Sequence, residues 1–352
     1  MAAKQKSRAS RASRSHAKPA AAAHPRRKSP AAHGKSAPRR APARAPHPLL
    51  VTGSIGIDTI ITPEARADSV LGGSATYFAA ASAKFASTAL VSVAGNDLKP
   101  QARAFYHGSK NIDATDLTIV ADGKTFAWSG EYLEDFKERV TLKTELNTVI
   151  GYDPQVSHHH RGIPYVFLAN TDPGWQAKVL DQMHAPRFVG VDTMNLWIAN
   201  NLPQVKQLLR RADLLLVNDS EARELTGEKS LLKAARAILA LGPKALIIKK
   251  GPFGSSLYTK DGAFHLPAHE IPTVVDPTGA GDSFAGGLMG YLAATGRHDL
   301  KAIRAGMLVG AVCAAMAVSD FSVHALQSAS RAEIVGQARR LRKTTLCDDL
   351  KL

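Results

Sequence analysis

Short apolar runs alternate with helical stretches along most of the chain. Runs of apolar residues without polar interruption predict buried strands, and helical periodicity between them predicts helices. The predicted strands cover residues 49–57, 88–93, 165–169, 188–191, 214–217 and 245–248. The predicted helices cover residues 74–85, 96–108, 175–183, 202–211, 221–225 and 231–241. Because this alternation is typical of a parallel sheet that is buried on both faces, the pattern predicts an α/β fold.

Residues 123–150 follow a different pattern. Trp128 and Tyr132 stand in a stretch where every second residue is apolar or small, and Thr and Val are frequent after it. This period of two predicts antiparallel strands rather than a crossover helix. Together with residues 59–62, the segment predicts a second, smaller sheet, with the charged stretch 131–139 as an exposed turn.

Polar side chains stand at or just past the ends of several predicted strands. Ligands of parallel sheets bind beyond the carboxyl ends of the strands, so these side chains predict a site at that edge. They are Asp58, Asp192, Asn218 and Asp276.

Residues 274–287 carry the most informative motif, Val-Val-Asp-Pro-Thr-Gly-Ala-Gly-Asp-Ser-Phe-Ala-Gly-Gly. The motif predicts a strand over 271–275, then a turn of small residues, then an apolar helix. Small residues at a helix start let backbone N–H groups approach an anion, and the helix dipole adds positive charge there. Asp282 lies in this turn. It is either a helix N-cap or a base that accepts a proton from an attacking hydroxyl.

The string Asp-Pro-Thr-Gly-Ala-Gly-Asp-Ser-Phe resembles the second signature of the PfkB (ribokinase-like) family of carbohydrate and nucleoside kinases. The resemblance extends over roughly residues 49–340. It implies a three-layer α/β/α ribokinase-like fold with a mostly parallel central sheet. It also implies a small β-sheet lid over the substrate, from about residues 58–70 and 123–150. Consistently, the sequence contains neither a Walker-type G-x-x-x-x-G-K-[ST] nor a dinucleotide-binding G-x-G-x-x-G.

The resemblance implies a reaction in which the γ-phosphoryl group of ATP passes to a substrate hydroxyl. Asp282 is then the general base that accepts the hydroxyl proton. The backbone N–H groups of Gly279, Ala280 and Gly281 form an anion hole that stabilises charge on the transferring group.

Two further matches imply the substrate side. Gly-Ser-Ile-Gly-Ile-Asp58 resembles the family's opening strand, whose Asp binds substrate hydroxyls, and a carboxylate suits a vicinal diol. Leu-Gly72-Gly73-Ser-Ala-Thr-Tyr77 resembles the family's other signature, where glycines let the backbone approach a sugar. Tyr77 stands where the family usually has Asn, which predicts an altered pocket. Its ring either stacks on a nucleobase or cyclitol, or belongs to the core of the helix.

Two matches imply the nucleotide side. Asn218 and Glu221 fit the family's Asn-x-x-Glu element, linked there to magnesium and phosphate positioning. Glu221 could hold a water of Mg²⁺, and the same pair could also form a capping box. Lys249, Gly251 and Gly254 lie in a strand–Gly-x-x-Gly loop that resembles the family's loop beside the ATP phosphates and adenine.

Further positions gain roles from the resemblance alone. Thr278 belongs to the nucleotide-binding set, and with Asp276 it matches positions that help form a K⁺ site in some members. Asp192 and Asn195 fall where family members carry a related pair near the active site.

Basic charge is concentrated in residues 1–47. They hold five Lys and eight Arg with no Asp or Glu, which accounts for 13 of the net charge of +15. Their low apolar content predicts disorder. The tail is either a nonspecific nucleic-acid-binding arm or an inert solvated segment, and an organellar transit peptide is a third alternative.

Residues 48–343 are then the kinase domain and residues 344–352 a C-terminal tail. Cys313 in an apolar helix and Cys347 in the tail suit a reducing cytoplasm rather than a disulfide framework. The sequence contains no apolar segment typical of a secretory signal and no uninterrupted apolar run of 18 residues. We therefore expect no membrane partner. The run His158–His160 predicts a loop rather than a metal site, because no other ligand cluster has zinc-like spacing.

We therefore expect a cytoplasmic enzyme that phosphorylates a sugar or sugar-like molecule and uses ATP and Mg²⁺. K⁺ is a further cofactor if Asp276 and Thr278 form the K⁺ site found in some family members. A nucleoside kinase of the adenosine type is the second hypothesis, since these enzymes share the motifs. A catalytically idle sugar sensor with a nucleic-acid-docking tail is the third. The retained Asp282 argues against the sensor, because a mere binder has little need for a base. A homodimer is one alternative for the oligomeric state.

Overall fold

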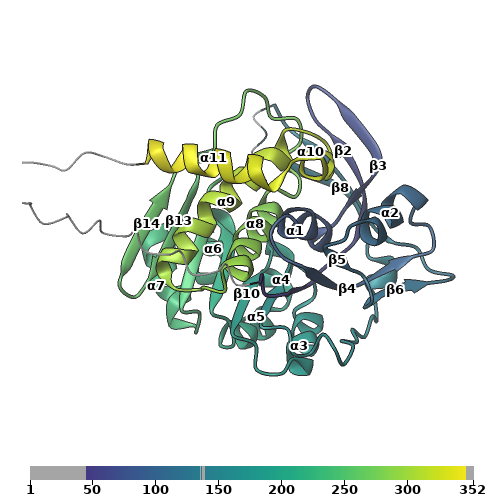
Figure 1. Ribbon diagram of the computed structural model, residues 1–352, viewed down its shortest axis with the longest axis horizontal. Helices are drawn as coiled ribbons and strands as arrows, with labels where there is room; N and C mark the ends of the chain where they lie inside the picture. The colour runs from purple at the N-terminus through teal and green to yellow at the C-terminus, as the bar shows by residue number, and fades with distance from the viewer. Residues whose placement is uncertain (1–44, 135, 137–138, 346–352) are drawn as a thin grey trace, which may run out of the picture. The chain divides into compact units, whose positions relative to one another are not determined.

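The central sheet has ten strands in the order β14-β13-β12-β11-β10-β9-β1-β4-β5, and β6 pairs with β4 (Figure 1). All neighbours pair in parallel except β13 and β14, which add an antiparallel hairpin at one edge. The strands are β1 (Leu49–Thr52), β4 (Thr88–Gly95), β5 (Ile112–Asp113), β6 (Leu117–Val120), β9 (Tyr165–Leu168), β10 (Phe188–Asp192), β11 (Leu214–Asn218), β12 (Ala245–Lys249), β13 (Ser255–Thr259) and β14 (Gly262–Leu266).

The computed structural model describes residues 45–345, apart from 135, 137 and 138. These residues belong to one structural unit, 44–352. The predicted basic tail lies outside the described residues except for residues 45–47. Cys347 and most of the predicted C-terminal tail also lie outside them.

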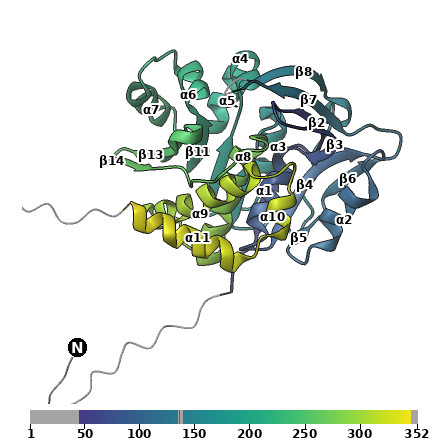
Figure 2. The same ribbon diagram turned by 90° about the horizontal axis from the view of Figure 1, so that it is seen from above.

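Helices cover both faces of the central sheet, and two apolar clusters separate them from it. Alternate residues of a strand point to opposite faces, so in β11 Leu214 and Leu216 join one cluster while Leu215 and Val217 join the other. In Figure 2, α8, α9 and α11 lie on one side of the strands and α5, α6 and α7 on the other. The predicted three-layer α/β/α fold is thereby confirmed.

The helices on the first side are α1 (Ser74–Ser82), α8 (Ala280–Thr295), α9 (Leu300–Val318) and α11 (Arg331–Thr344). Those on the second are α3 (Pro173–Gln182), α4 (Asn195–Asn200), α5 (Leu202–Leu209), α6 (Asp219–Thr226) and α7 (Leu231–Ala240). The shorter or peripheral ones are α2 (Pro100–Gly108), α10 (His324–Ser328), η1 (Asn147–Val149) and η2 (Gly251–Phe253).

A second sheet of four strands has the order β3-β2-β7-β8. Its strands are β2 (Gly56–Ile61), β3 (Arg66–Gly72), β7 (Phe126–Tyr132) and β8 (Arg139–Glu145). The outer pairs are antiparallel, as predicted, but β2 and β7 run parallel. A parallel pair needs a crossover, and here β3, α1, β4, α2, β5 and β6 lie between the two strands along the chain.

Two sequence predictions about strands are wrong. Residues 49–57 form not one strand but the end-to-end pair β1 and β2 in different sheets, so Asp58 lies inside β2 rather than past a central strand. The chain leaves the central sheet at Gly53, where a Cβ would lie 2.5 Å from Ser74 Oγ. Residues 271–275 are irregular, and the carbonyl of Val318 accepts from the N–H groups of Val275 and Asp276.

Helix α9 is long and apolar enough to cross a membrane by length and composition. However, 61% of its most apolar window is buried inside the protein, and its buried residues belong to the same cluster as those of α8. This burial is typical of the core helix of an α/β domain.

Glycines on α8 allow its close packing against two neighbours. A Cβ on Gly286 would lie 2.3 Å from the carbonyl oxygen of Phe78 in α1, and one on Gly287 would lie 2.7 Å from Cys313 Sγ in α9. Backbone cannot yield as a flexible side chain can. The position of α8, and of the motif at its start, therefore depends on these glycines.

We expect Gly286→Ala to lower the free energy of unfolding by about 1–3 kcal/mol through overpacking, although Ala favours helices over Gly by about 1 kcal/mol. Gly336→Ala is the matched control, because nothing lies within 4 Å of a Cβ at this position in α11. The control should gain about 0.5–1 kcal/mol. Urea unfolding of both variants measures the difference, and stabilisation by both would contradict the packing argument.

Candidate active site

The motif at 274–287 forms the turn that leads into α8. Gly279 precedes the helix with φ +74°, in the left-handed region, and a Cβ there would lie 2.2 Å from the Tyr77 ring. Only glycine combines this conformation with such close packing. The first N–H groups of a helix have no partner within it, so the α8 start can present donors to an anion. The N–H of Ala280 donates to the Pro277 carbonyl at 3.3 Å, which leaves those of Gly279 and Gly281 as the better placed donors.

An ion pair joins the ends of two central strands beside this turn. Lys249 Nζ at the end of β12 lies 2.9 Å from Asp192 Oδ2 at the end of β10, and both side chains are largely buried. A Cβ on Gly281 would lie 2.9 Å from the same Nζ. The ammonium group therefore reaches the first turn of α8 from the sheet edge.

Asn218 and Glu221 form a reciprocal capping box at the start of α6. The N–H of Glu221 donates to Asn218 Oδ1 at 2.8 Å, and the N–H of Asn218 donates to Glu221 Oε2 at 2.7 Å. The structure thus accounts for this pair as a cap. The cap also fixes the Glu221 carboxylate beside Asp192 and Lys249, whose charges both act on it.

Three carboxylates and one ammonium group share this edge. Burial, then the charge of Asp192, raises the pKa of Asp282 to about 8, while Lys249 partly opposes the shift. Burial likewise raises the pKa of Glu221 to about 7. Burial disfavours the charge on Lys249, but Asp192 and Glu221 outweigh it and raise the pKa of the ammonium group. The cluster therefore holds one ammonium group with a raised pKa and two carboxylates, Asp282 and Glu221, whose pKa values lie near neutral pH.

A second cluster of polar groups lies between the second sheet and the motif. Three of its buried oxygens have no hydrogen-bond partner among the described residues: Asp58 Oδ1, Tyr77 Oη and Asp276 Oδ2. Burial, then the charge of Asp276, raises the pKa of Asp58 to about 7, and burial raises that of Asp276 to about 6. Unpaired buried polar atoms are rare in folded proteins, so a cluster of them marks a place where a polar ligand or water completes the hydrogen bonding.

Glycines shape this second cluster. A Cβ on Gly72 would lie 1.9 Å from Asp58 Oδ2, so glycine leaves the room that the carboxylate occupies. Gly73 has φ +95°, and a Cβ on it would lie 2.5 Å from the carbonyl oxygen of Ser54. Packing within the protein alone therefore requires glycine at both positions, whether or not they also contact a ligand.

Tyr77 is a core residue by packing. Its side chain is 1% exposed, and its ring lies against Gly279. The charges of Asp58 and Asp276, after burial itself, raise the pKa of its hydroxyl, so the polar tip faces the second cluster. Neither ring face is open to a stacking partner, which removes the basis for the stacking interpretation.

The second sheet contacts the motif directly. Tyr132 on β7 and Thr278 in the motif share a hydrogen bond of 3.0 Å between their hydroxyl oxygens. Trp128 lies on the same face of β7 as Tyr132 and pairs in register with Asp58. The Arg139 guanidinium lies 5.2 Å from the centroid of the Trp128 ring. The sequence analysis did not assign Trp128, Tyr132 or Arg139 to the site, although the alternation on β7 could have placed Trp128 and Tyr132 on one face.

The remaining predicted residues lie around these clusters. The loop after Lys249 has positive φ at Gly251 (53°) and Gly254 (77°), and the N–H of Lys250 donates to the Gly254 carbonyl at 2.8 Å. The N–H of Thr278 donates to Asp276 Oδ1 at 2.8 Å. The side chain of Asn195 donates a hydrogen bond to Glu224 on α6 and takes no part in the ion pair between Asp192 and Lys249.

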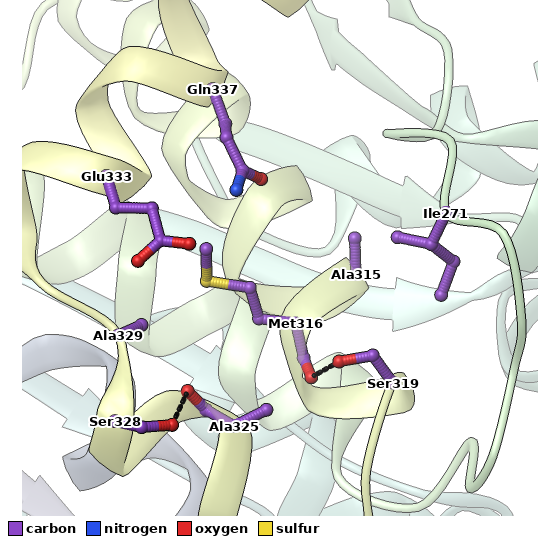
Figure 3. A pocket seen from close by; sticks show the side chains of 9 residues that line it. All are labelled: Ile271, Ala315, Met316, Ser319, Ala325, Ser328, Ala329, Glu333 and Gln337. Carbon is purple, nitrogen blue, oxygen red and sulfur yellow. Dashed lines mark hydrogen bonds between the residues drawn. The ribbon is translucent and has the colours of Figure 1, made fainter.

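A cavity of about 380 Å³ lies outside this region, between α9, α10 and α11 (Figure 3). No predicted site residue lines it. The hydroxyls of Ser319 and Ser328 point to carbonyls of their own helices, and Gln337 Oε1 accepts from His269. The cavity therefore offers few free polar groups, and the chemistry lies with the two clusters at the sheet edge.

Comparison with known proteins agrees with this assignment of the fold and motifs. Residues 172–325 match the pfkB family of carbohydrate kinases. The chain is 30% identical to the cytidine kinase of Thermococcus kodakarensis over 268 residues, 74% of this chain and 93% of that protein. It is 33% identical to the aminoimidazole riboside kinase of Salmonella typhimurium over 123 residues, 34% of this chain and 38% of that protein.

Solved structures resemble this one in fold. The nucleoside kinase of Methanocaldococcus jannaschii gives a TM-score of 0.67 at 20% identity, over 84% of this chain and 100% of that one. The fructokinase of Vibrio cholerae, bound to fructose, ADP and calcium ion, gives 0.69 at 18% identity, over 83% of this chain and 99% of that one.

The chain belongs to the PfkB family of carbohydrate kinases. It is a sugar or nucleoside kinase of the ribokinase type, that is, a phosphotransferase with an alcohol group as acceptor, in a family that uses ATP.

The raised pKa of Asp282 predicts a pH-dependent cost in stability. Because its pKa is about 8 in the folded protein and 3.8 as the ordinary value, the folded state binds the proton more tightly. Its contribution is fully present below about pH 4 and is lost as the pH rises through about 8. The loss accumulates between these two pKa values, so Asp282→Asn should raise the free energy of unfolding at both pH values, and by about 1–3 kcal/mol more at pH 8.5 than at pH 5.5. Urea unfolding at both values tests this, and a gain confined to pH 5.5 would contradict it.

Proposed function

We propose that this kinase transfers the γ-phosphoryl group of ATP to a ribose hydroxyl of a nucleoside, with Asp282 as the general base. The observation that carries the proposal is the raised pKa of Asp282, about 8, at a helix start that faces Lys249. A general base works best when its pKa lies near the working pH. A mere helix cap would need neither the burial nor the two neighbouring carboxylates.

The nucleotide side rests on the α8 start and the Lys249 ammonium group. The N–H groups of Gly279, Ala280 and Gly281 and the helix dipole suit the charge that develops on the transferring phosphoryl group. Lys249 lies against Gly281, where it can neutralise phosphate oxygens. Gly251 and Gly254 give the next loop the positive φ values that let its backbone follow the nucleotide.

The donor set fits Mg²⁺, which prefers oxygen ligands and keeps several waters. Asn218 and Glu221 would hold it, Glu221 through a water, and Mg²⁺ would neutralise charge on the phosphates. The buried, unpaired Asp276 Oδ2 beside Thr278 likewise fits K⁺. Both assignments keep the roles implied by the sequence.

The acceptor side rests on the second cluster. Asp58 Oδ1 and the Tyr77 hydroxyl are buried without a hydrogen-bond partner in the part of the chain that the structure describes, and they face the same region, so they suit the hydroxyls of a diol. The backbone at Gly72 and Gly73 leaves room beside Asp58. As the acceptor oxygen attacks the γ-phosphorus and the bond from that phosphorus to ADP breaks, the proton of the hydroxyl passes to Asp282, and Lys249 offsets the negative charge of the cluster.

Trp128 favours a nucleoside over a free sugar. Its ring is partly exposed on the sheet face that carries Asp58 and Tyr132, and the Arg139 guanidinium lies over it. A nucleobase attached to the ribose at Asp58 could stack on this ring, whereas a free sugar has no group to place there. The cytidine kinase relative, aligned over most of both chains, supports the same choice.

The second sheet acts as a lid in this proposal. Its bond from Tyr132 to Thr278 ties it to the motif, which excludes water from Asp282 during transfer. A free sugar acceptor is the second candidate, because fructokinases and ribokinases are also relatives. Nucleic-acid binding by residues 1–47 and a homodimer have no support from the comparisons and stay predictions, as does the cytoplasmic location.

Asp282→Asn should lower kcat by roughly 10²–10⁴-fold, the usual contribution of a positioned general base. The amide keeps the size of the side chain in the first turn of α8, whose N-cap is Gly279, but cannot take the proton. ATP affinity should hold or rise slightly, since a negative charge near the phosphates is gone.

Asp299→Asn is the matched control for this loss. Asp299 caps α9 by accepting from the N–H groups of Lys301 and Ala302, so Asn should preserve both its cap and full activity. The measurement is ADP release with cytidine and other nucleosides. A folded Asp282→Asn enzyme with kcat within about threefold of wild type would rule out Asp282 as the base.

Trp128→Ala should raise KM for the nucleoside by roughly 5- to 150-fold, since loss of base stacking costs about 1–3 kcal/mol. KM for ATP should stay unchanged, and Trp128→Phe should retain most of the nucleoside affinity. A panel of nucleosides and free sugars provides the comparison. Equal losses for a nucleoside and for ribose would contradict stacking while leaving the kinase assignment intact.

A further inference from the structure

A group of metal-ligand residues lies away from the active site, at the edge of the central sheet formed by β5 and β6. Asp113 on β5 and His159 and His160 in the turn before β9 bring one potential ligand atom each within 4.8 Å of one another. None of the three belongs to either active-site cluster. The sequence predicted a loop at the His run, which is confirmed, but the spacing of residues could not show that Asp113 lies beside it.

The separation of ligand atoms suits a metal ion. His160 Nε2 lies 3.1 Å from Asp113 Oδ2. Two ligands that each sit about 2.0–2.1 Å from a tetrahedral ion are about 3.3 Å apart, so little movement is needed.

The other ring nitrogen of His160, Nδ1, is hydrogen-bonded to a second carboxylate. Nδ1 lies 2.7 Å from Asp116 Oδ2, and the same oxygen accepts from the N–H and the hydroxyl of Ser157 at 3.1 and 3.0 Å. Histidines that bind metals usually donate their second ring N–H to a carboxylate, which fixes the ring and the tautomer. Asp116 therefore leaves Nε2 as the nitrogen that faces Asp113.

The third potential ligand, His159, is exposed, whereas Asp113 and His160 are held by hydrogen bonds. His160 is 4% exposed, and the Asp113 side chain is about 40% exposed. His159 is exposed, with its ring centroid 4.0 Å from that of His160. One open and two anchored ligands leave a fourth position for water. Metal binding here would link β5 to the segment that leads into β9.

We propose that Asp113, His159 and His160 form a binding site for a divalent transition ion of the zinc type, distinct from the magnesium of the kinase reaction. Two imidazoles and one carboxylate select such an ion over Mg²⁺, which prefers oxygen ligands alone. The ion stabilises the folded chain because the unfolded chain does not bring the three ligands together.

The test uses the full-length chain without an affinity tag, stripped of metal with a chelator and free of nucleotide. Co²⁺ is the probe, since its visible spectrum reports tetrahedral coordination. His159→Gln removes one ligand without touching the Asp113–His160–Asp116 hydrogen bonds. His158→Gln is the matched control, an exposed neighbour outside the group. Histidines elsewhere, including those of residues 1–44, contribute equally to all three proteins.

We expect wild type and His158→Gln to bind one Co²⁺ with a tetrahedral spectrum, to exchange it for Zn²⁺, and to gain in Tm. His159→Gln should bind at least tenfold more weakly at this site and lose the gain in Tm. Equal affinity in all three proteins, equal loss in both variants, or no tetrahedral band in wild type would overturn the proposal. In those cases the group is only a histidine bridging two aspartates.

Discussion

The ion pair between Lys249 and Asp192 is the interaction on which the organisation of the site depends. It joins the carboxyl ends of β12 and β10, which are separated in the sheet by β11, and places an ammonium group against Gly281 at the start of α8. Without this cation, Asp192, Glu221 and Asp282 would be three largely buried carboxylates that lack their main positive neighbour, since Arg139 acts only weakly on Glu221. A buried pair of this kind contributes little net stability, but breaking it leaves an uncompensated charge.

The same electrostatics link stability to function. Burial and mutual repulsion raise the pKa values of Asp282, Glu221 and Asp58 to about 8, 7 and 7. The folded chain is less stable at high pH for each of them, because the unfolded chain releases these protons more readily. Functional sites commonly carry such a cost, since a carboxylate tuned toward neutral pH is better suited to accept a proton.

Glycine positions hold the site together sterically. Gly279 accommodates the Tyr77 ring, Gly72 accommodates the Asp58 carboxylate, and Gly286 accommodates the backbone of α1. Each brings together segments more than ten residues apart in sequence, and each would clash if it carried a Cβ. The motif is therefore positioned by packing behind it as well as by its own turn, which explains why so many small residues occur in one stretch.

Local periodicity and a rare order of residues were enough to predict the α/β class, most of the parallel strands and the motif that contains Asp282. The sequence by itself could not separate β1 from β2 or pair β2 with β7, since one apolar run looks the same in one sheet as in two. The sequence could not decide whether the Tyr77 ring belongs to the pocket or to the core. The structure decides for the core, because the ring is buried against Gly279.

Only the tertiary structure brought Lys249 to Asp192, Tyr132 to Thr278 and Asp113 to the His run. Contacts between residues dozens of positions apart depend on where the sheets place their strands. That placement results from burial of apolar surface over the whole chain rather than from any local pattern of residues.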